Sequence, residues 1–406
     1  MLWVTFSPCL YIFENYYFHY NSSLTTNAIN SLSSVYMFTY PVVIHFTIHI
    51  FDNTTTIPGN GLKRIVLYGG LFNTVGALVR WLGATPSSTS FIILFIGQTI
   101  GSFAQVLLAI PPQLAVTWFP KSEINFATAI AVSANNLGIA FGCILSPAVV
   151  KEPTMMDDIP RLLLCQFIMC SISLVLLISA FQKPAPFNPV DHEPQINFDD
   201  STSKRLFKEK NFIYMLIAYG AIMGAQCSVI TLIAQILLPP FSGILNENDI
   251  GLLAAITLSV GVPGSIIVGH YLDKTKKYSK VCNILITFTT ISIFSLYVSI
   301  EYENYYGVLI SCILFGISSY STCPALFQYA GELFHPIREI IPTSYLFLIG
   351  NIGGVILVAL MGFNENIKWK FSMRLPMVFL MGIMIIGNIA MIRVKGVLKR
   401  SYTSIL

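Results

Sequence analysis

The sequence predicts an all-α membrane protein with twelve spanning helices, and three observations carry that prediction. Residues of the set AVILMFWYC make up 54% of the 406 residues, and the mean hydropathy is +0.70. Charged residues make up only 10%, whereas a soluble domain usually carries about 25%. Apolar runs of about 20 residues, the length needed to cross a bilayer, also recur along the chain. The charge is therefore too sparse to solvate the surface of a soluble protein of this length.

Each expected span is an apolar run of helical length. Eleven runs are long enough to cross a membrane: 30–51, 65–85, 89–119, 124–150, 159–181, 211–240, 249–272, 281–300, 304–331, 340–363 and 371–394. The opening, MLWVTFSPCLYIFENYYF (residues 1–18), is apolar from its first residue but short. Because it has no basic leading segment, it does not resemble a signal peptide. We expect it to be the second half of a twelfth spanning helix.

One long polar segment, residues 182–210, divides the series into six runs before it and six after it. Its prolines, mixed charge and few large apolar residues are typical of a flexible linker. We therefore predict an N-terminal six-helix half (1–181), a cytoplasmic linker (182–210), and a C-terminal half with a short cytoplasmic tail (211–406). This organisation resembles that of the major facilitator superfamily.

The distribution of basic residues predicts the orientation. If the first helix runs outward, 17 of the Lys and Arg residues lie on the cytoplasmic side and five on the outer side, as the positive-inside rule requires. Arg80 lies near the outer end of its span and is expected to snorkel to the interface. The net charge of +4 is thus a topology signal and not a nucleic-acid footprint. The expected partners are the lipid bilayer and a small-molecule substrate, and we expect a monomer.

Two loops at equivalent places in the halves echo each other. FDN…GLKR follows the second span and contains Asp52, and GHYLDKTKK follows the eighth span and contains Asp273. Both resemble the superfamily's signature after the second helix, which implies that these carboxylates cap or pair across the cytoplasmic face and act in gating. The alternative is an ordinary charged interface. The first copy carries an insert, TTTIPGN, that sets its geometry apart.

Several stretches resemble the FLVCR-like family (feline leukaemia virus subgroup C receptor-related, solute carrier family 49). They are WVTFSP, LSSVYM, GQTIGSFAQVLLAIPPQLAVTWFP, ATAIAVSANNLGIAFGCILSPAVV, KNFIYMLIAYGAIMGAQCSVITLIAQIL and FQYAGELFHPIRE, in order over most of residues 1–364. The resemblance implies transport of a small organic solute by alternating access. In the family, half a helix and a tail precede the segment that matches WVTFSP. We therefore expect an incomplete gene model or a truncated product, with a natural minimal form as the alternative.

Trp3 is the first candidate for the substrate site. It lies about 11 residues deeper than Glu14, hence about 16 Å from the outer end of its helix, near the midplane where such transporters bind substrate. In choline-transporting relatives this tryptophan packs on the quaternary ammonium group; an indole face attracts a desolvated cation by about 2 kcal/mol. The alternative is a tryptophan of the interfacial belt or one that faces lipid.

The relatives complete the cage with a tyrosine where this chain has Cys227, and a thiol offers no π face. The neighbouring Gln226, or an aromatic residue of another helix, is left to compensate. Asn136 (in SANNLG) and Asn351 (in IGNIGG) match positions where the relatives have glutamine. Amides that face a cavity can bond a substrate hydroxyl, although Asn and Gln also join helices. Gln98, Gln105 and Gln235 are further candidates of this kind.

The positions of the acidic residues bear on whether transport is coupled to protons. Of the 19 Asp and Glu residues, only Glu14 and Glu332 touch expected spans, both near helix ends. Proton-driven transporters usually keep a relay carboxylate or histidine within the membrane, so this pattern favours facilitated diffusion. Glu332, Arg338 and Glu339 are predicted to form an intracellular gate cluster, with a solvated loop as the alternative. The chain has no Walker A, HExxH or catalytic-triad motif, so we expect no enzyme activity, metal or cofactor.

The sequence thus predicts passive transport of a small amine such as choline or ethanolamine. Haem, or a vitamin like pyridoxine, is the alternative substrate within the same class. A non-transporting receptor or a degenerate pseudotransporter is the alternative of another class. We expect the plasma membrane, with the lysosomal and mitochondrial membranes as alternatives.

Overall fold

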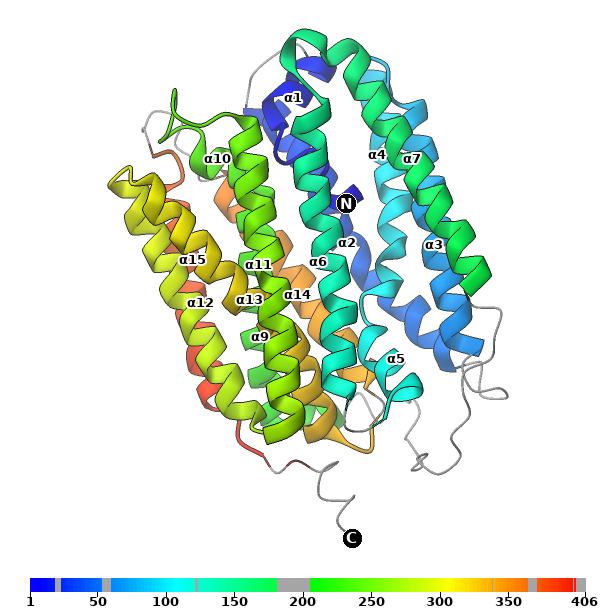
Figure 1. Cartoon of the computed structure of the whole chain (residues 1–406), viewed down its shortest axis with the longest axis vertical. Coiled ribbons are helices and arrows are strands. Elements are labelled where there is room, and N and C mark those ends of the chain that lie inside the picture. Colours follow the sequence, from blue (N-terminus) through cyan, green and yellow to red (C-terminus); the bar gives the residue numbers. More distant parts are fainter. Residues whose placement is uncertain are drawn as a thin grey trace.

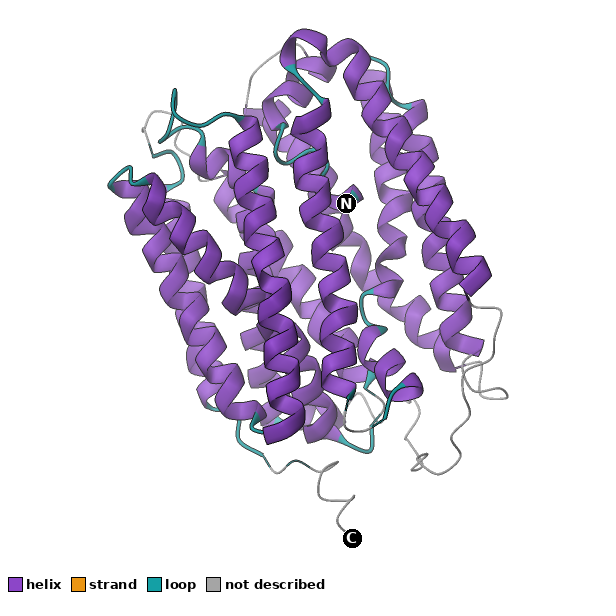
Figure 2. Ribbon diagram, viewed as in Figure 1, coloured by secondary structure: helices purple, strands orange, loops and turns teal. Residues whose placement is uncertain are grey.

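A computed structural model shows the chain as a bundle of long helices (Figures 1 and 2). The structure describes residues 1–18, 23–52, 60–120, 123–180, 205–337, 339–363, 371–396 and 398. Within these ranges the regular elements are all helices, which confirms the predicted all-α class. Most of the predicted linker, and the residues after 398, lie outside the described ranges, so the domain boundaries stay predictions.

The elements follow the expected runs closely. In the first half they are η1 (Leu2–Val4), α1 (Leu10–Phe18), α2 (Ser23–Asp52), α3 (Asn60–Leu82), α4 (Ser88–Ser102), η2 (Phe103–Leu107), α5 (Pro111–Trp118), α6 (Ile124–Val149), η3 (Glu152–Thr154) and α7 (Met155–Ala180). In the second half they are α9 (Lys210–Thr231), α10 (Ile233–Leu237), α11 (Glu247–Thr275), α12 (Tyr278–Glu301), α13 (Tyr305–Phe334), α14 (Ile340–Phe363) and α15 (Arg374–Ile392). Ten helical stretches of the described part are long and apolar enough to cross a membrane. With η1–α1 and α2, they account for twelve spans.

Two spans depart from the expected single helix. In the first, the turn η1 is separated from the nine-residue α1 by non-helical residues, so the expectation of one continuous helix there is wrong. The fourth span is also divided. Helix α4 begins at the cap Ser87, whose hydroxyl accepts a bond from the backbone N–H of Ser90, and it gives way to the 3₁₀ turn η2. Helix α5 then starts at Pro111. Proline lacks a backbone N–H and clashes with the preceding turn inside a helix, but it fits the first helical position. The Pro111–Pro112 pair therefore separates two helices within one apolar run.

Two close helix contacts join the halves along α6 and α11. A Cβ built on Gly251 of α11 would lie 2.5 Å from the carbonyl oxygen of Cys143, and one on Gly269 would lie 3.0 Å from that of Asn125. Cys143 and Asn125 lie near opposite ends of α6, so the two backbones stay close over most of their length. Small residues permit such an approach in a membrane, where van der Waals packing replaces the hydrophobic effect between helices.

We call the side at which α7 ends and α9 begins the linker side. The residues that follow α15 lie on the same side, since the side-chain amide of Asn211, near the start of α9, donates to the backbone oxygen of Lys395 at 2.6 Å. An even number of spans places both ends of the bundle on one side. The distribution of basic residues makes this the expected cytoplasmic side.

Candidate functional site

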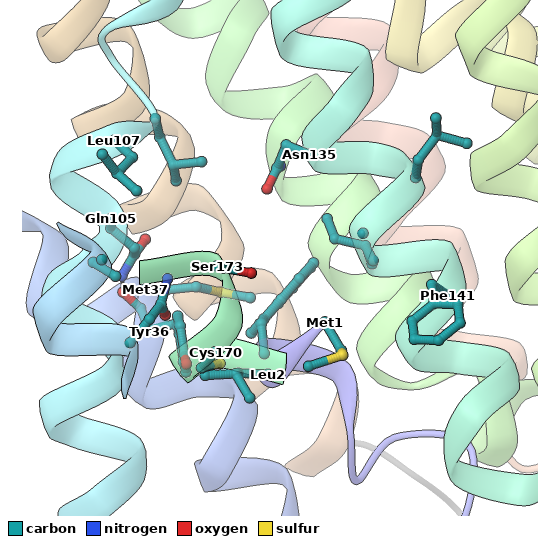
Figure 3. A pocket seen from close by; sticks show the side chains of 18 of the residues that line it. Met1, Leu2, Tyr36, Met37, Gln105, Leu107, Asn135, Phe141, Cys170 and Ser173 are labelled. Carbon is teal, nitrogen blue, oxygen red and sulfur yellow. Dashed lines mark hydrogen bonds between the residues drawn. The ribbon is translucent and has the colours of Figure 1, made fainter. Parts of the chain in front are cut away.

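A cavity of about 620 Å³ lies between the two halves (Figure 3). Helices α2, α3, α6 and α7 and the turns η1 and η2 supply its wall in the first half, and α9 and α14 supply its wall in the second. In Figure 3, Tyr36, Met37 and Gln105 lie on one side of the space and Asn135 of α6 faces them. No Asp, Glu or His side chain is among the described residues that line it.

Trp3 lines this cavity from η1 and is held by α2. Its indole Nε1 donates to the backbone oxygen of Ser33 at 3.1 Å, and the Ser33 hydroxyl donates to the backbone oxygen of Trp3 at 3.1 Å. The Ser7 hydroxyl lies 3.3 Å from that of Ser33. These bonds anchor the polar edge of the indole, so its orientation is fixed before any substrate enters.

The wall from the second half consists of two pairs of residues, each one helical turn apart. Met223 and Cys227 come from α9, and Phe347 and Asn351 come from α14. The amide nitrogen of Asn351 donates to the backbone oxygen of Phe347 at 2.8 Å. This bond uses one of the two N–H groups of the Asn351 amide, and the amide oxygen is the atom with which Asn351 can accept a hydrogen bond.

Four aromatic rings pack together beside this wall, and we call them the aromatic floor: Tyr40, Tyr219, Phe327 and Phe347. The Phe347 centroid lies 5.0 Å from that of Phe327, 5.8 Å from that of Tyr219 and 6.0 Å from that of Tyr40. Such tilted and edge-on pairs are favourable aromatic contacts. On their helices these rings lie to the linker side of Met37, Cys227 and Asn351. The floor therefore lies on the linker side of the part of the cavity that Met37, Cys227 and Asn351 line.

Polar groups of the first half complete the cavity. The amide nitrogen of Gln105 donates to the backbone oxygen of Tyr36 and, at 3.3 Å, to the hydroxyl of Thr39. The Tyr36 hydroxyl is buried and has no hydrogen-bond partner among the described residues. The hydroxyl oxygen lies beside Gly101 of α4, 3.1 Å from the position of a Cβ on that glycine, so Tyr36 lines the cavity with its ring and not with its hydroxyl.

Of the predicted substrate-site residues, the structure brings four to the cavity, namely Trp3, Gln105, Cys227 and Asn351. It does not bring Asn136, Gln226 or Gln235 there. Asn135, the neighbour of Asn136, lines the cavity instead. Successive residues of a helix point about 100° apart, so the side chain of Asn136 points in a different direction from that of Asn135.

The other two amides bind within or between helices. The Gln226 side chain meets the thiol of Cys323, with its amide nitrogen 3.6 Å from Sγ. The Gln235 oxygen accepts a bond of 3.5 Å from the amide of Asn30. Both side chains are buried, and their contacts correspond to the helix-joining alternative.

The sequence reasoning missed Tyr36 and Phe347 as cavity residues. Both had a signal. Phe347 lies four residues before the candidate Asn351, and positions i and i+4 share one face of a helix. Tyr36 lies in LSSVYM, one of the stretches that carries the family resemblance, and immediately before the cavity residue Met37.

Asp273 joins the halves on the linker side. One carboxylate oxygen accepts bonds from the backbone N–H of Asn125, at 3.3 Å, and from its side-chain amide, and the other accepts from the N–H of Phe126 at 3.0 Å. These N–H groups lie at the start of α6, where a helix attracts negative charge. The Lys276 ammonium lies 3.8 Å from the same carboxylate. A residue of the second half thus caps a helix of the first.

The other predicted gating residues are partly outside the described part. The side chain of Asp52 and the whole of Arg338 lie there. Glu332 and Glu339 are described, and they are 3% and 2% exposed. The alternative of a solvated loop is therefore wrong for these two carboxylates, and their gating role stays a prediction.

Arg80 does not snorkel as expected. It is 1% exposed, because partners inside the first half hold it. Its Nη2 donates to the side-chain oxygen of Gln166 at 2.9 Å, and its guanidinium lies 5.1 Å from the ring centroid of Phe6. The Gln166 nitrogen in turn donates to the hydroxyl of Thr5 at 3.0 Å. The arginine thus ties α3 to α7 and to the segment that follows Trp3.

Comparison with known families identifies the bundle. The family model described as Major Facilitator Superfamily matches residues 1–358. A solved structure of a D-xylose–proton symporter superposes with a TM-score of 0.72 at 10% identity, over 97% of this chain and 95% of that one. The transporter FucP in its outward conformation superposes with a TM-score of 0.66 at 13% identity, over 96% of each chain. At these identities the structures show the fold alone.

Curated relatives confirm the predicted resemblance to FLVCR-like proteins. The chain is 28% identical to the choline/ethanolamine transporter FLVCR1 of Felis catus, over 98% of this chain and 70% of the relative. It is 27% identical to solute carrier family 49 member A3 of Xenopus tropicalis, over 89% of this chain and 73% of the relative. An uncharacterised MFS-type transporter of Caenorhabditis elegans is 28% identical, over 98% and 67%.

Proposed function

The chain belongs to the Major Facilitator Superfamily, and on that premise we propose that it moves a small organic amine of the choline or ethanolamine type across a membrane by alternating access. The observation that carries the proposal is the anchored indole of Trp3 on the wall of the cavity. Relatives named choline/ethanolamine transporters, at 25–28% identity, support the same substrate class.

The chemistry of the cavity suits an amine that keeps its charge. An isolated cation is expensive to bury unless the protein replaces its hydration. With no carboxylate among the described lining residues, that replacement falls to aromatic faces and to amide and hydroxyl dipoles. The Trp3 face attracts the cation. Asn351 supplies a hydrogen-bonding group suited to the hydroxyl of an amino alcohol.

Alternating access requires contacts between the halves that break and re-form while the site stays intact. On the linker side we assign that role to Asp273 with the start of α6, and we extend it to Asp52, Glu332, Arg338 and Glu339 as the sequence predicts. Release of the Asp273 carboxylate from the N–H groups of Asn125 and Phe126 would free α11 from α6 at that end. The aromatic floor, which includes Tyr40 from the first half and three rings from the second, would separate with it.

We further propose that flux is passive. The described cavity wall holds no carboxylate or histidine that could carry a proton, and the buried charge of Arg80 is cationic. Uptake by membrane vesicles should therefore follow the substrate gradient. An imposed inward proton gradient that raises choline uptake several-fold would contradict passive transport.

The test of the substrate class is equilibrium binding of labelled choline to the full chain in lipid nanodiscs. Trp3→Ala should weaken binding about 30-fold, because about 2 kcal/mol of cation–π attraction is removed at 1.4 kcal/mol per tenfold. Trp81→Ala is the matched control: it removes an indole of the same half that stacks on Phe167 and is not among the described lining residues. Equal choline affinity of Trp3→Ala and the parent would overturn the amine assignment. Pyridoxine or haem binding in its place would support the alternative substrates.

A further inference from the structure

The cavity wall from the second half contains one aromatic residue among those described, Phe347. The other aromatic lining residues, Trp3, Tyr36 and Phe141, all belong to the first half. A substrate that couples the movement of two halves must touch both of them. An ammonium group bound between the halves therefore meets a π face from the second half only at Phe347.

The Phe347 ring is held in place before a substrate arrives. It is 6% exposed, and three other rings of the aromatic floor, Tyr40, Tyr219 and Phe327, pack against it with centroids 5.0–6.0 Å away. A side chain that is already immobilised loses little conformational freedom on binding. This support distinguishes Phe347 from a flexible residue that merely borders the space.

The other groups on that wall cannot hold a cation by a π face. Cys227 and Met223 carry sulfur, and Asn351 carries an amide. Asn351 complements Phe347 in another way, because it lies one turn further along α14. Side chains one turn apart start about 5–6 Å from each other, which suits a molecule whose ammonium and hydroxyl groups are two carbons apart.

We propose that Phe347 is the second aromatic wall of the cation site and sets the preference for amino alcohols together with Asn351. The ammonium group lies between Trp3 and Phe347, and the hydroxyl group donates to the amide oxygen of Asn351. This inference rests on the proposed function of amine transport, and it adds a specificity-determining residue on α14.

The experiment compares choline with its neutral isostere, 3,3-dimethylbutan-1-ol, by competition binding to the full chain in nanodiscs. Phe347→Leu keeps an apolar side chain and removes the π face, so choline affinity should fall about tenfold, within the range of a cation–π contact. Affinity for the isostere should change much less. Phe379→Leu, on the outward face of α15, is the matched control and should bind both ligands as the parent does.

A second series guards against a variant that fails to fold. Stepwise fluorination of the Phe347 ring keeps its shape and drains negative charge from its face, so choline affinity should fall at each step while affinity for the isostere stays constant. Equal losses for both ligands in either series would show that Phe347 only packs, and would overturn the inference. Choline binding unchanged by Phe347→Leu but lost in Trp3→Ala would overturn this inference alone. A parent chain that does not bind choline would overturn the proposed function and this inference together.

Discussion

Glycines bring helices together in both halves, for example Gly76 of α3 against Gly101 of α4, but around the start of the protein a chain of polar side chains also joins α3 and α7 to the segment that follows Trp3. Arg80, Gln166 and Thr5 are linked by bonds of 2.9 and 3.0 Å. In the second half a Cβ on Gly316 of α13 would lie 2.0 Å from the carbonyl oxygen of Thr257 of α11. On the other side of that half, a Cβ on Gly353 of α14 would lie 2.7 Å from the oxygen of Gly220 of α9.

These two kinds of contact correspond to the two kinds of segment that carry the cavity residues. Trp3 lies on a short 3₁₀ turn outside any long helix, so directional hydrogen bonds from neighbouring helices have to position the segment around it. Phe347 and Asn351 lie within a regular helix, so close backbone packing of α14 on α9 is sufficient to place them. Hydrogen bonds fix an irregular segment, and small-residue contacts fix a regular one.

The largest effect should come from overfilling the contact between α11 and α13. Gly316→Ala puts a methyl group on the backbone of Thr257, which no side-chain movement can relieve, so the two helices must separate. We expect a loss at or above the upper end of the 1–3 kcal/mol typical of overpacking, seen as little folded protein after solubilisation. Gly382→Ala on α15, where a Cβ meets nothing within 4 Å, is the control. Normal yield and thermal stability of Gly316→Ala would show that this contact is not close.

Replacing one buried amide in each half should have a smaller effect on stability, and the loss should differ between the halves. Gln166→Leu removes the acceptor of Arg80 and should lower stability by about 2–3 kcal/mol, the cost of losing a hydrogen bond to a buried charge. Gln226→Leu in the second half removes only sulfur contacts with Cys323 and should cost less than about 1 kcal/mol. The unfolding midpoints of the two variants in detergent measure the difference. Equal midpoints would contradict the idea that the first half depends on its polar chain.

The smallest effect concerns the contact that joins the halves. Asp273→Asn removes the negative charge at the start of α6, whose attraction to the helix N-terminus stabilises the contact by about 1 kcal/mol or less. Its loss should shift the population several-fold toward states open on the linker side. Spin labels on the linker-side ends of α5 and α11 report that opening as longer distances. Asp249→Asn, at the capping box on the other end of α11, is the matched control. A distance distribution identical to that of the parent would exclude Asp273 as a lock.

The sequence by itself determined the class and order of the elements, because length and hydropathy are local properties. Twelve apolar runs predicted twelve spans, and the Pro111–Pro112 pair holds the signal for the break between α4 and α5. The expected depth of Trp3 rested on counting residues along one continuous helix, whereas the structure places Trp3 on the turn η1, separated from α1 by non-helical residues. The family resemblance, carried by ordered motifs, gave the substrate class to be tested.

Only the tertiary structure decided which side chains share a space. Asn135 and not Asn136 lines the cavity because the rotation of α6 is set by its packing on α11, and no single helix specifies that rotation. Arg80 turns inward because Gln166 and Phe6, distant in sequence, supply its partners. The aromatic floor gathers Tyr40, Tyr219, Phe327 and Phe347 from four helices. The role proposed for Phe347 depends on both halves, because the rings that hold it and the Trp3 indole on the same cavity come from different parts of the chain.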